Sequence, residues 1–405
     1  MTGPLHGLRV FDLTRILAGP TCTQILGDLG ADIIKVEQTG SGDDTRRFAP
    51  PFIKDQNGDD TAESAYFCGA NRNKRSITLN IADAEGQDLA RRLIACSDVM
   101  VENFKFGGLA KYGLSYDQLK DENPGLVYCS ITGFGHTGPY AERPGYDVLI
   151  QAMGGFMSIT GEPDGEPQKA GIPIADLMAG MYASVAINAA LRHREKTGEG
   201  QHIDIGMLDT MAATLSIMGS NFLSTGKAPP RLGNAHPNIV PYQVFATADG
   251  SMVLAAANDA QYQRFCEFAG VPELAVDENY KTNEKRVLNR KELVEKLQAV
   301  ITQKPTRHWT EGLEKVNVTC GPINTIDQVF ADPQVQARGM EIEMPHAATG
   351  NAPVHLIGSP IRMSKTGSEY RHSPPMLGEH TDEVLHELLG IDADAIAALR
   401  ERGVV

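Results

Sequence analysis

The segment 8–36 constrains the fold more than any other part of the chain, because it alternates strand and helix patterns. Leu8–Leu13 predicts a strand, Pro20 suits the first turn of a helix, and Gly30 suits the position just after its end. Asp32–Val36 predicts a second strand. Further strands are expected at 76–79, 98–101, 126–131 and 202–205, with helices at 85–95 and 177–191. This alternation predicts an α/β fold with a parallel sheet covered on both faces.

The chain is too long for one core. It has 405 residues, and single cores stop growing well below that size. The stretch Thr225–Pro230 has the composition of a linker. We therefore expect a first large domain in 1–224 and a smaller α+β domain from 225. Near the end, a helix is expected at 381–389 with Thr381 as its N-cap.

Charge and cysteine content narrow the functional classes. The formal net charge of −14 argues against general affinity for nucleic acid or an anionic membrane. The N-terminus lacks a basic region followed by an apolar core, and no uninterrupted apolar stretch approaches the roughly 20 residues that span a bilayer. Six cysteines occur without CxxC spacing, which predicts no metal site and no disulfide framework. We expect a cytoplasmic protein with reduced thiols.

Two motifs have competing interpretations. Gly133–Gly138 matches GxGxxG after a predicted strand, but Pro139 and Pro144 follow and leave no helix to face a pyrophosphate. A plain glycine loop is therefore favoured over dinucleotide binding. Asn71–Arg75 places three cations in five residues before a strand. This run is either a solvated turn or a set of donors for phosphate groups.

Asp176 stands at the start of a long apolar helix and has two open roles. It is either an N-cap that accepts free helix N–H groups or a nucleophile. An ionised carboxylate attacks an activated acyl group without needing a partner base. The chain carries no GxSxG or HExxH motif that would indicate another catalytic chemistry.

A series of motifs, taken in order, resembles the class III CoA-transferases, the family of formyl-CoA transferase and carnitine CoA-transferase (CaiB/BaiF type). The resemblance runs from about Leu5 to the C-terminal helix. The matching segments are Asp12–Pro20, Leu29–Glu37, Gly40–Asp43, Asn73–Ser76, Val101–Phe104, Arg143–Asp147 and the segment around Asp176.

The resemblance implies a fold and an assembly. The expected large domain is Rossmann-like, with a parallel sheet built from both chain ends, so that the chain returns to it in 336–405. The small domain in 225–335 is inserted between the two parts. Two copies of the chain are expected to form an interlocked homodimer.

The resemblance also implies a reaction and its residues. The carboxylate of Asp176 forms a mixed anhydride and then an aspartyl-CoA thioester, so that CoA passes between two acids. Acyl-CoA is a substrate, and no metal or permanently bound cofactor is expected. Asp147 is expected near the nucleophile, with Tyr146 beside it. The residues expected to contact CoA are Ile16, Ala18, Asn73, Lys74, Arg75, Asn103, Phe104 and Lys111.

This sequence departs from the family pattern at two places. Ala255–Gln261 stands where relatives have a glycine-rich lid, and alanine reaches positive φ less readily than glycine. Gln38 replaces a basic residue that some relatives have. The alternative activity, α-methylacyl-CoA racemase, needs a histidine where this chain has Tyr146, and a phenol is a poor base at neutral pH. A non-catalytic CoA-binding protein is the other alternative.

The acids that are exchanged are indicated by Gly233–Gln243, which looks most like the branch of succinate–hydroxymethylglutarate CoA-transferase. Succinyl-CoA is therefore the expected donor, and a dicarboxylate is the expected acceptor. A cation near the site would hold the second carboxylate. The candidates are Arg46, Arg47 and His236.

Overall fold

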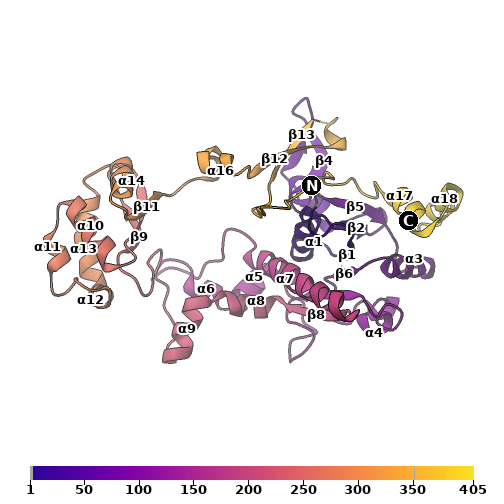
Figure 1. Cartoon of the computed structure of the whole chain (residues 1–405), viewed down its shortest axis with the longest axis horizontal. Helices are drawn as coiled ribbons and strands as arrows, with labels where there is room; N and C mark the ends of the chain where they lie inside the picture. Colours follow the sequence, from indigo (N-terminus) through magenta and orange to yellow (C-terminus); the bar gives the residue numbers. More distant parts are fainter. Residues whose placement is uncertain (1–2, 351) are drawn as a thin grey trace. The chain divides into compact units, whose positions relative to one another are not determined.

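The computed structural model describes residues 3–350 and 352–405 and divides the chain into two compact units (Figure 1). Unit 1 consists of residues 1–156, 170–215 and 333–405, and unit 2 consists of residues 157–169 and 216–332. The main part of unit 2 thus begins at Ser216, nine residues before the expected linker. Unit 2 also includes the short earlier segment 157–169, which the sequence did not indicate.

Unit 1 is built on a six-stranded parallel sheet with the order β5-β2-β1-β6-β7-β8. Counted along the chain, this is the order 3-2-1-4-5-6 of a doubly wound sheet. The second and third strands are added on one side of β1 and the next three on its other side. The strand order therefore switches between β1 and β6, and a crevice is expected at the carboxyl ends of these two strands. The strands are β1 (Arg9–Leu13), β2 (Asp32–Glu37), β5 (Lys74–Thr78), β6 (Val99–Glu102), β7 (Val127–Thr132) and β8 (Gln201–Gly206).

Helices cover both faces of this sheet, because successive strand residues point to opposite sides. Phe11 packs with one buried cluster and its neighbour Val10 with another. The first cluster includes residues of α3 (Ala84–Ala95), α17 (Thr381–Leu389) and α18 (Ala393–Glu401). The second includes residues of α1 (Ala18–Asp28), α5 (Asp147–Met153), α7 (Ile174–Thr197) and α8 (Met207–Thr214).

The expectation that both chain ends supply strands to the parallel sheet is wrong. All six strands come from residues 9–206. The C-terminal segment instead packs α17 on β5 and α3 and adds a separate hairpin of β12 (Glu341–Pro345) and β13 (Pro353–Ile357) (Figure 1). Thr381 is also not an N-cap: His380 holds that position, and the Thr381 hydroxyl accepts the backbone N–H of Thr78.

The remaining elements of unit 1 are short. They are η1 (Asp44–Arg47), β3 (Phe52–Lys54), β4 (Asp60–Ser64), α2 (Ala65–Ala70), η2 (Ala110–Tyr112), α4 (Tyr116–Leu119), α16 (Pro333–Ala337) and η3 (Ala347–Thr349).

The helix α7 is the longest element, and it packs closely on α1. A Cβ on Gly180 would lie 2.5 Å from the carbonyl oxygen of Ala18, so only glycine allows this approach. By length and composition alone, α7 could cross a membrane. The core helix of a soluble protein meets the same criterion. In unit 1 the residues Ala179, Ala183 and Ile187 of α7 are fully buried.

Unit 2 combines a three-stranded antiparallel sheet, β11-β10-β9, with helices around a core that includes Trp309 and Phe245. The segment Ala255–Gln261 is the turn from β10 into α10, whose N-cap Asn258 accepts the N–H of Gln261. The elements are β9 (Tyr242–Ala246), β10 (Ser251–Ala255), β11 (Thr319–Pro322), α9 (Ser216–Thr225), α10 (Asp259–Ala269), α11 (Glu273–Val276), α12 (Asn283–Leu288), α13 (Arg290–Ile301), α14 (Thr306–Lys315) and α15 (Ile326–Ala331), with α6 (Phe156–Ile159) at the unit boundary.

Candidate active site

A cavity of about 240 Å³ opens at the carboxyl ends of the central strands of unit 1. Its walls come from the loops after β1, β6 and β7 and from the first turn of α7. The loops after β1 and β6 are tied together, because the Asn103 side chain accepts the Arg15 N–H at 3.0 Å and donates to the Arg15 carbonyl at 2.7 Å. The cavity therefore lies at the crevice that the strand order predicts.

Asp176 lines this cavity from the third residue of α7 and is not the helix cap. Asp147, the first residue of α5, fills that role. Its Oδ1 accepts the N–H of Ala175 at 2.8 Å and of Asp176 at 3.3 Å, while Oδ2 accepts from Gln151 at 2.6 Å. Within the described residues the Asp176 carboxylate itself has no hydrogen bond or ion pair. Asp176 therefore lines the cavity with a carboxylate that is not engaged by these residues.

The environment of Asp176 makes it more basic than an ordinary aspartate. Burial, together with the nearby charge of Asp147, raises the pKa of Asp176 to about 7. A carboxylate with this pKa is about half ionised at neutral pH. Burial raises the free energy of the ionised carboxylate, and attack on an acyl carbon would remove this unfavourable charge.

The expected glycine loop has a steric role that brings Asp147 to Asp176. Built on Gly133, a Cβ would lie 2.5 Å from the Cα of Gly145, and one built on Gly145 would lie 2.4 Å from the Cα of Gly133. The two backbones therefore touch at the end of β7. This contact carries the following residues, Tyr146 and Asp147, to the cavity wall. The GxGxxG match reflects close backbone packing here.

Tyr146 also lines the cavity but is 72% exposed. It occupies the N-cap position of α5.

A second cavity of about 210 Å³ adjoins the first and shares Arg15, Asp44 and Phe104 with it. It lies at the carboxyl ends of β1 and β2, where nucleotides bind in doubly wound folds. Gln38, noted above as a departure from the family pattern, lines this cavity. Together the two cavities extend from the nucleotide position of the fold to Asp176.

Four of the residues expected to contact CoA are found at these cavities. Ile16, Ala18 and Asn103 line the first, and Phe104 lines both. Lys111 lies outside both linings, with its ammonium 4.6 Å from the centre of the Tyr112 ring, and that ring lines the second cavity.

The basic run before β5 has a structural arrangement that the sequence did not reveal. Asn73 donates to Asp28 at 2.8 Å, Lys74 lies 3.1 Å from Asp12, and Arg75 lies 2.7 Å from Asp32. All three side chains are buried, and none lines either cavity. Burial lowers the pKa of Lys74 to about 8, although Asp12 acts in the opposite direction. Any role of this run toward CoA stays a prediction.

The three candidates for holding a second carboxylate do not line the Asp176 cavity. Arg46 is buried between Glu37, at 2.8 Å, and Glu63, at 3.1 Å. Arg47 is exposed and lies 3.7 Å from Asp44. His236 belongs to unit 2, where its ring stacks on Tyr242.

Three cations that the sequence analysis did not select do line the Asp176 cavity: Arg15, Lys105 and Arg143. Arg15 lies 3.2 Å from Asp44. The guanidinium of Arg143 lies over the Tyr140 ring at 4.5 Å and has no carboxylate partner among the described residues. Its position two residues before Gly145, within a motif already matched to the family, was the available signal.

Among the described residues, no group of three or more His, Cys, Asp or Glu side chains could hold a metal ion.

Comparison with known proteins gives a consistent result. The model of CoA-transferase family III matches residues 5–381. A succinate–glutarate CoA-transferase of Agrobacterium fabrum is 48% identical over 392 residues, which are 97% of each chain. The succinyl-CoA:glutarate CoA-transferase of Homo sapiens is 44% identical over 402 residues, or 99% of this chain and 90% of that protein.

Among solved structures, a CaiB/BaiF family protein from Brucella suis superposes with a TM-score of 0.83 at 49% identity. The match covers 96% of this chain and all of that one. Because sequence and structure agree over nearly the full length, the chain belongs to CoA-transferase family III.

Proposed function

We propose that this enzyme transfers CoA from succinyl-CoA to a dicarboxylate, with glutarate as the leading acceptor. The observation that carries the proposal is the Asp176 carboxylate, which is unpaired among the described residues and lines a cavity that shares wall residues with a second cavity at the nucleotide position of the fold. The relatives named for succinate and glutarate support this choice of acids.

The proposed reaction is a sequence of acyl transfers through Asp176. The carboxylate attacks the thioester carbonyl, and the CoA thiolate leaves, which gives a mixed anhydride of Asp176 and succinate. The thiolate then attacks the aspartyl carbonyl, releases succinate and forms the Asp176–CoA thioester. The acceptor carboxylate displaces the thiolate in turn. Attack of the thiolate on the acceptor's acyl carbon gives the new CoA ester and regenerates the Asp176 carboxylate.

The start of α1 supports this chemistry. Ala18, its first residue, lines the cavity, and α1 has no side chain capping its N-terminus. The first N–H groups of a helix have no partner inside the helix. They are therefore suited to stabilise the negative oxygen that develops as each carbonyl is attacked.

Arg143 is the proposed partner of the acceptor's second carboxylate. It lines the same cavity as Asp176, and the Phe134 and Tyr140 rings lie beside its guanidinium at 5.4 and 4.5 Å. Such rings keep the planar group in place while its N–H donors stay free for a carboxylate.

The decisive experiment mixes the protein with succinyl-CoA and isotopically labelled glutarate. Labelled glutaryl-CoA, detected by mass spectrometry, would support the proposal, and so would a hydroxamate at Asp176 after hydroxylamine quenching. Deuterium exchange at C2 of a branched acyl-CoA without any new thioester would instead assign racemase chemistry. CoA binding with neither reaction would assign a non-catalytic binding protein.

The interlocked homodimer and the cytoplasmic location are further proposals. Large apolar side chains stand exposed on α5 and α7, among them Val148, Tyr182 and Val185, which is 66% exposed. A second copy of the chain would cover such a surface. Light scattering coupled to size-exclusion chromatography tests the assembly, and a monomeric mass would contradict it.

A further inference from the structure

The backbone of Ile16, at the wall of the active-site cavity, has an unfavourable conformation. Its φ of 70° lies in the left-handed region. A β-branched residue rarely adopts such a φ, because Cβ crowds the backbone there. Such a conformation persists only where surrounding contacts enforce it, and it is concentrated at functional sites.

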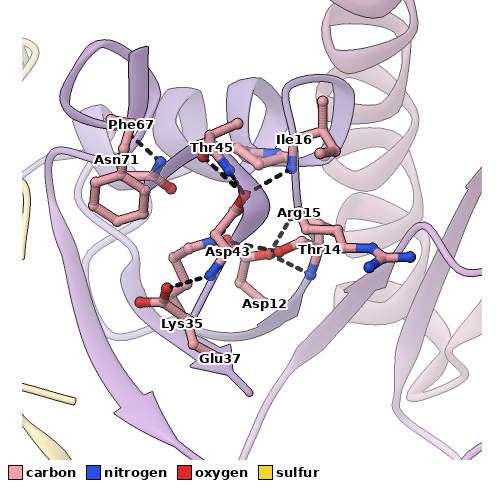
Figure 2. A network of polar contacts seen from close by, with 12 residues as sticks. Asp12, Thr14, Arg15, Ile16, Lys35, Glu37, Asp43, Thr45, Phe67 and Asn71 are labelled. Atoms are coloured by element: carbon pink, nitrogen blue, oxygen red, sulfur yellow. Dashed lines mark hydrogen bonds and ion pairs between the residues drawn. The ribbon is translucent and has the colours of Figure 1, made fainter. Parts of the chain in front are cut away.

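Asp43 supplies that enforcing contact. Its Oδ1 accepts the backbone N–H of Ile16 at 3.2 Å and the Thr45 N–H and hydroxyl at 3.0 and 2.8 Å. Its Oδ2 accepts from the Lys35 ammonium at 2.9 Å, and the same ammonium donates to the Thr14 carbonyl at 3.1 Å. Figure 2 shows Asp43 between Lys35 and the turn that carries Ile16. One ion pair therefore holds both ends of the turn 14–16.

This ion pair is almost completely enclosed, since the side chains of Lys35 and Asp43 are 0% and 1% exposed. Burial alone would raise the pKa of Asp43, but Lys35 and the hydrogen bonds from Thr45 outweigh it and lower the pKa to about 2. Asp43 is therefore a permanent anion, and hydrogen bonds to a charged acceptor are stronger than neutral ones.

The turn lies at the junction of the two cavities. Ile16 and Ala18 line the cavity of Asp176, Thr14 lines the second, and Arg15 lines both. We propose that Asp43 is a positioning residue for acyl-CoA: it holds Ile16 in the left-handed conformation, so that the turn 14–18 presents its backbone to both cavities. This inference rests on the proposed function.

The first test is Asp43→Asn, alone and combined with Ile16→Gly. An amide has only one acceptor oxygen, so the variant side chain cannot accept from both the Lys35 ammonium and the Ile16 N–H, which bind different oxygens of Asp43. We expect the single change to raise the KM for succinyl-CoA about tenfold, about 1.4 kcal/mol, with kcat changed less. Glycine adopts a positive φ without strain, so Ile16→Gly should reduce the effect of Asp43→Asn on KM to less than about threefold. An equal KM increase in both backgrounds would overturn the proposal.

Two further variants separate positioning from general stability. Thr45→Val removes one donor to Asp43 without changing charge, and it should raise KM in the same direction by a smaller factor. Asp28→Asn breaks another buried ion pair of unit 1, with Arg72 at 2.6 Å, at a place that lines neither cavity. It should lower stability and leave KM unchanged. An equal KM increase in Asp28→Asn would also overturn the proposal.

Amide hydrogen exchange of the peptide that covers residues 14–18 gives a readout that does not depend on catalysis. Exchange should be faster in Asp43→Asn than in the wild type and unchanged in Asp28→Asn. Unchanged exchange in Asp43→Asn would overturn the positioning role even if the enzyme were active. Conversely, a wild type without CoA transfer would refute the proposed function, while faster exchange in Asp43→Asn would still support the role of Asp43 in the turn.

Discussion

Asp147 caps the helix that carries Asp176: one carboxylate oxygen accepts the N–H of Ala175 at 2.8 Å and of Asp176 itself at 3.3 Å. The cap fixes the backbone of the proposed nucleophile. At the same time it places a negative charge next to the Asp176 carboxylate, which adds to the burial that raises the pKa of Asp176. The backbone position and the basicity of Asp176 are thus both influenced by the same neighbour.

Asp147→Asn separates these two effects, because the amide oxygen can still accept both N–H groups while the charge is lost. In the proposed mechanism the ionised form of Asp176 is the nucleophile, so the wild-type rate should rise with pH through about 7 and level off above it. In Asp147→Asn the pKa of Asp176 should fall and the rising limb should move to lower pH. The pH dependence of kcat/KM checks this, and an unmoved limb would show that burial alone sets the pKa.

Asp176→Asn should abolish CoA transfer and change the pH dependence of stability. Because the folded-state pKa of Asp176 is raised above the ordinary value of 3.8, its contribution to stability is present below about pH 4 and is lost as pH rises through about 7. The neutral amide avoids this loss.

The Tm of Asp176→Asn should therefore exceed that of the wild type at about pH 8 and approach it at about pH 4. Thermal unfolding over this range is the measurement, and CoA affinity should stay within about tenfold, about 1.4 kcal/mol. A variant that is less stable than the wild type at every pH would contradict the burial of an uncompensated charge.

Arg143→Gln tests recognition of the second carboxylate. If Arg143 holds that group, the change should raise the KM for glutarate by about tenfold to a hundredfold, as expected for one charged hydrogen-bonded pair. Succinyl-CoA also carries a free carboxylate, so its KM cannot serve as the control. Butyrate, an acceptor acid without a second carboxylate, is the internal control. Arg47→Gln is the matched control variant, because Arg47 lines neither cavity. Equal losses with butyrate and glutarate would remove Arg143 from this role.

Local patterns sufficed to predict the part of the fold that positions the site. The unit at 8–36 was expected from turn residues and apolar spacing alone, and the structure confirms β1, α1 and β2 there. Asp176 could be selected because a carboxylate at the start of an apolar helix is a local feature. Its freedom from the capping role could not be predicted, because Asp147 comes from 29 residues earlier in the chain.

Contacts across the sheet explain what the sequence did not show. Lys74 and Arg75 form a conspicuous cationic run on β5, but their partners Asp12 and Asp32 lie on β1 and β2, 62 and 43 residues away in the chain. Which charged side chains form ion pairs depends on strand order and register, and a short sequence segment specifies neither. For the same reason Arg46 was a candidate for substrate binding, although Glu37 and Glu63 neutralise it.

The final prediction concerns Glu102, the last residue of β6. Its side chain is buried, and its Oε2 accepts the backbone N–H of Phe104 at 2.7 Å. Glu102 therefore holds the first turn of the loop after β6. Burial raises the pKa of Glu102 to about 7. The folded state therefore favours the protonated form, and stability is lost as pH rises from about 4.5 to about 7.

In Glu102→Gln the amide oxygen can still accept from Phe104, and no charge forms at high pH. Relative to the wild type, the variant should gain up to about 3 kcal/mol in free energy of unfolding between about pH 5 and pH 8. Urea unfolding at the two pH values measures this gain, with the exposed Glu401→Gln as a control that should show none. A gain that is the same at both pH values would mean that Glu102 does not titrate between them, and the loop after β6 would then be held by a permanent charge.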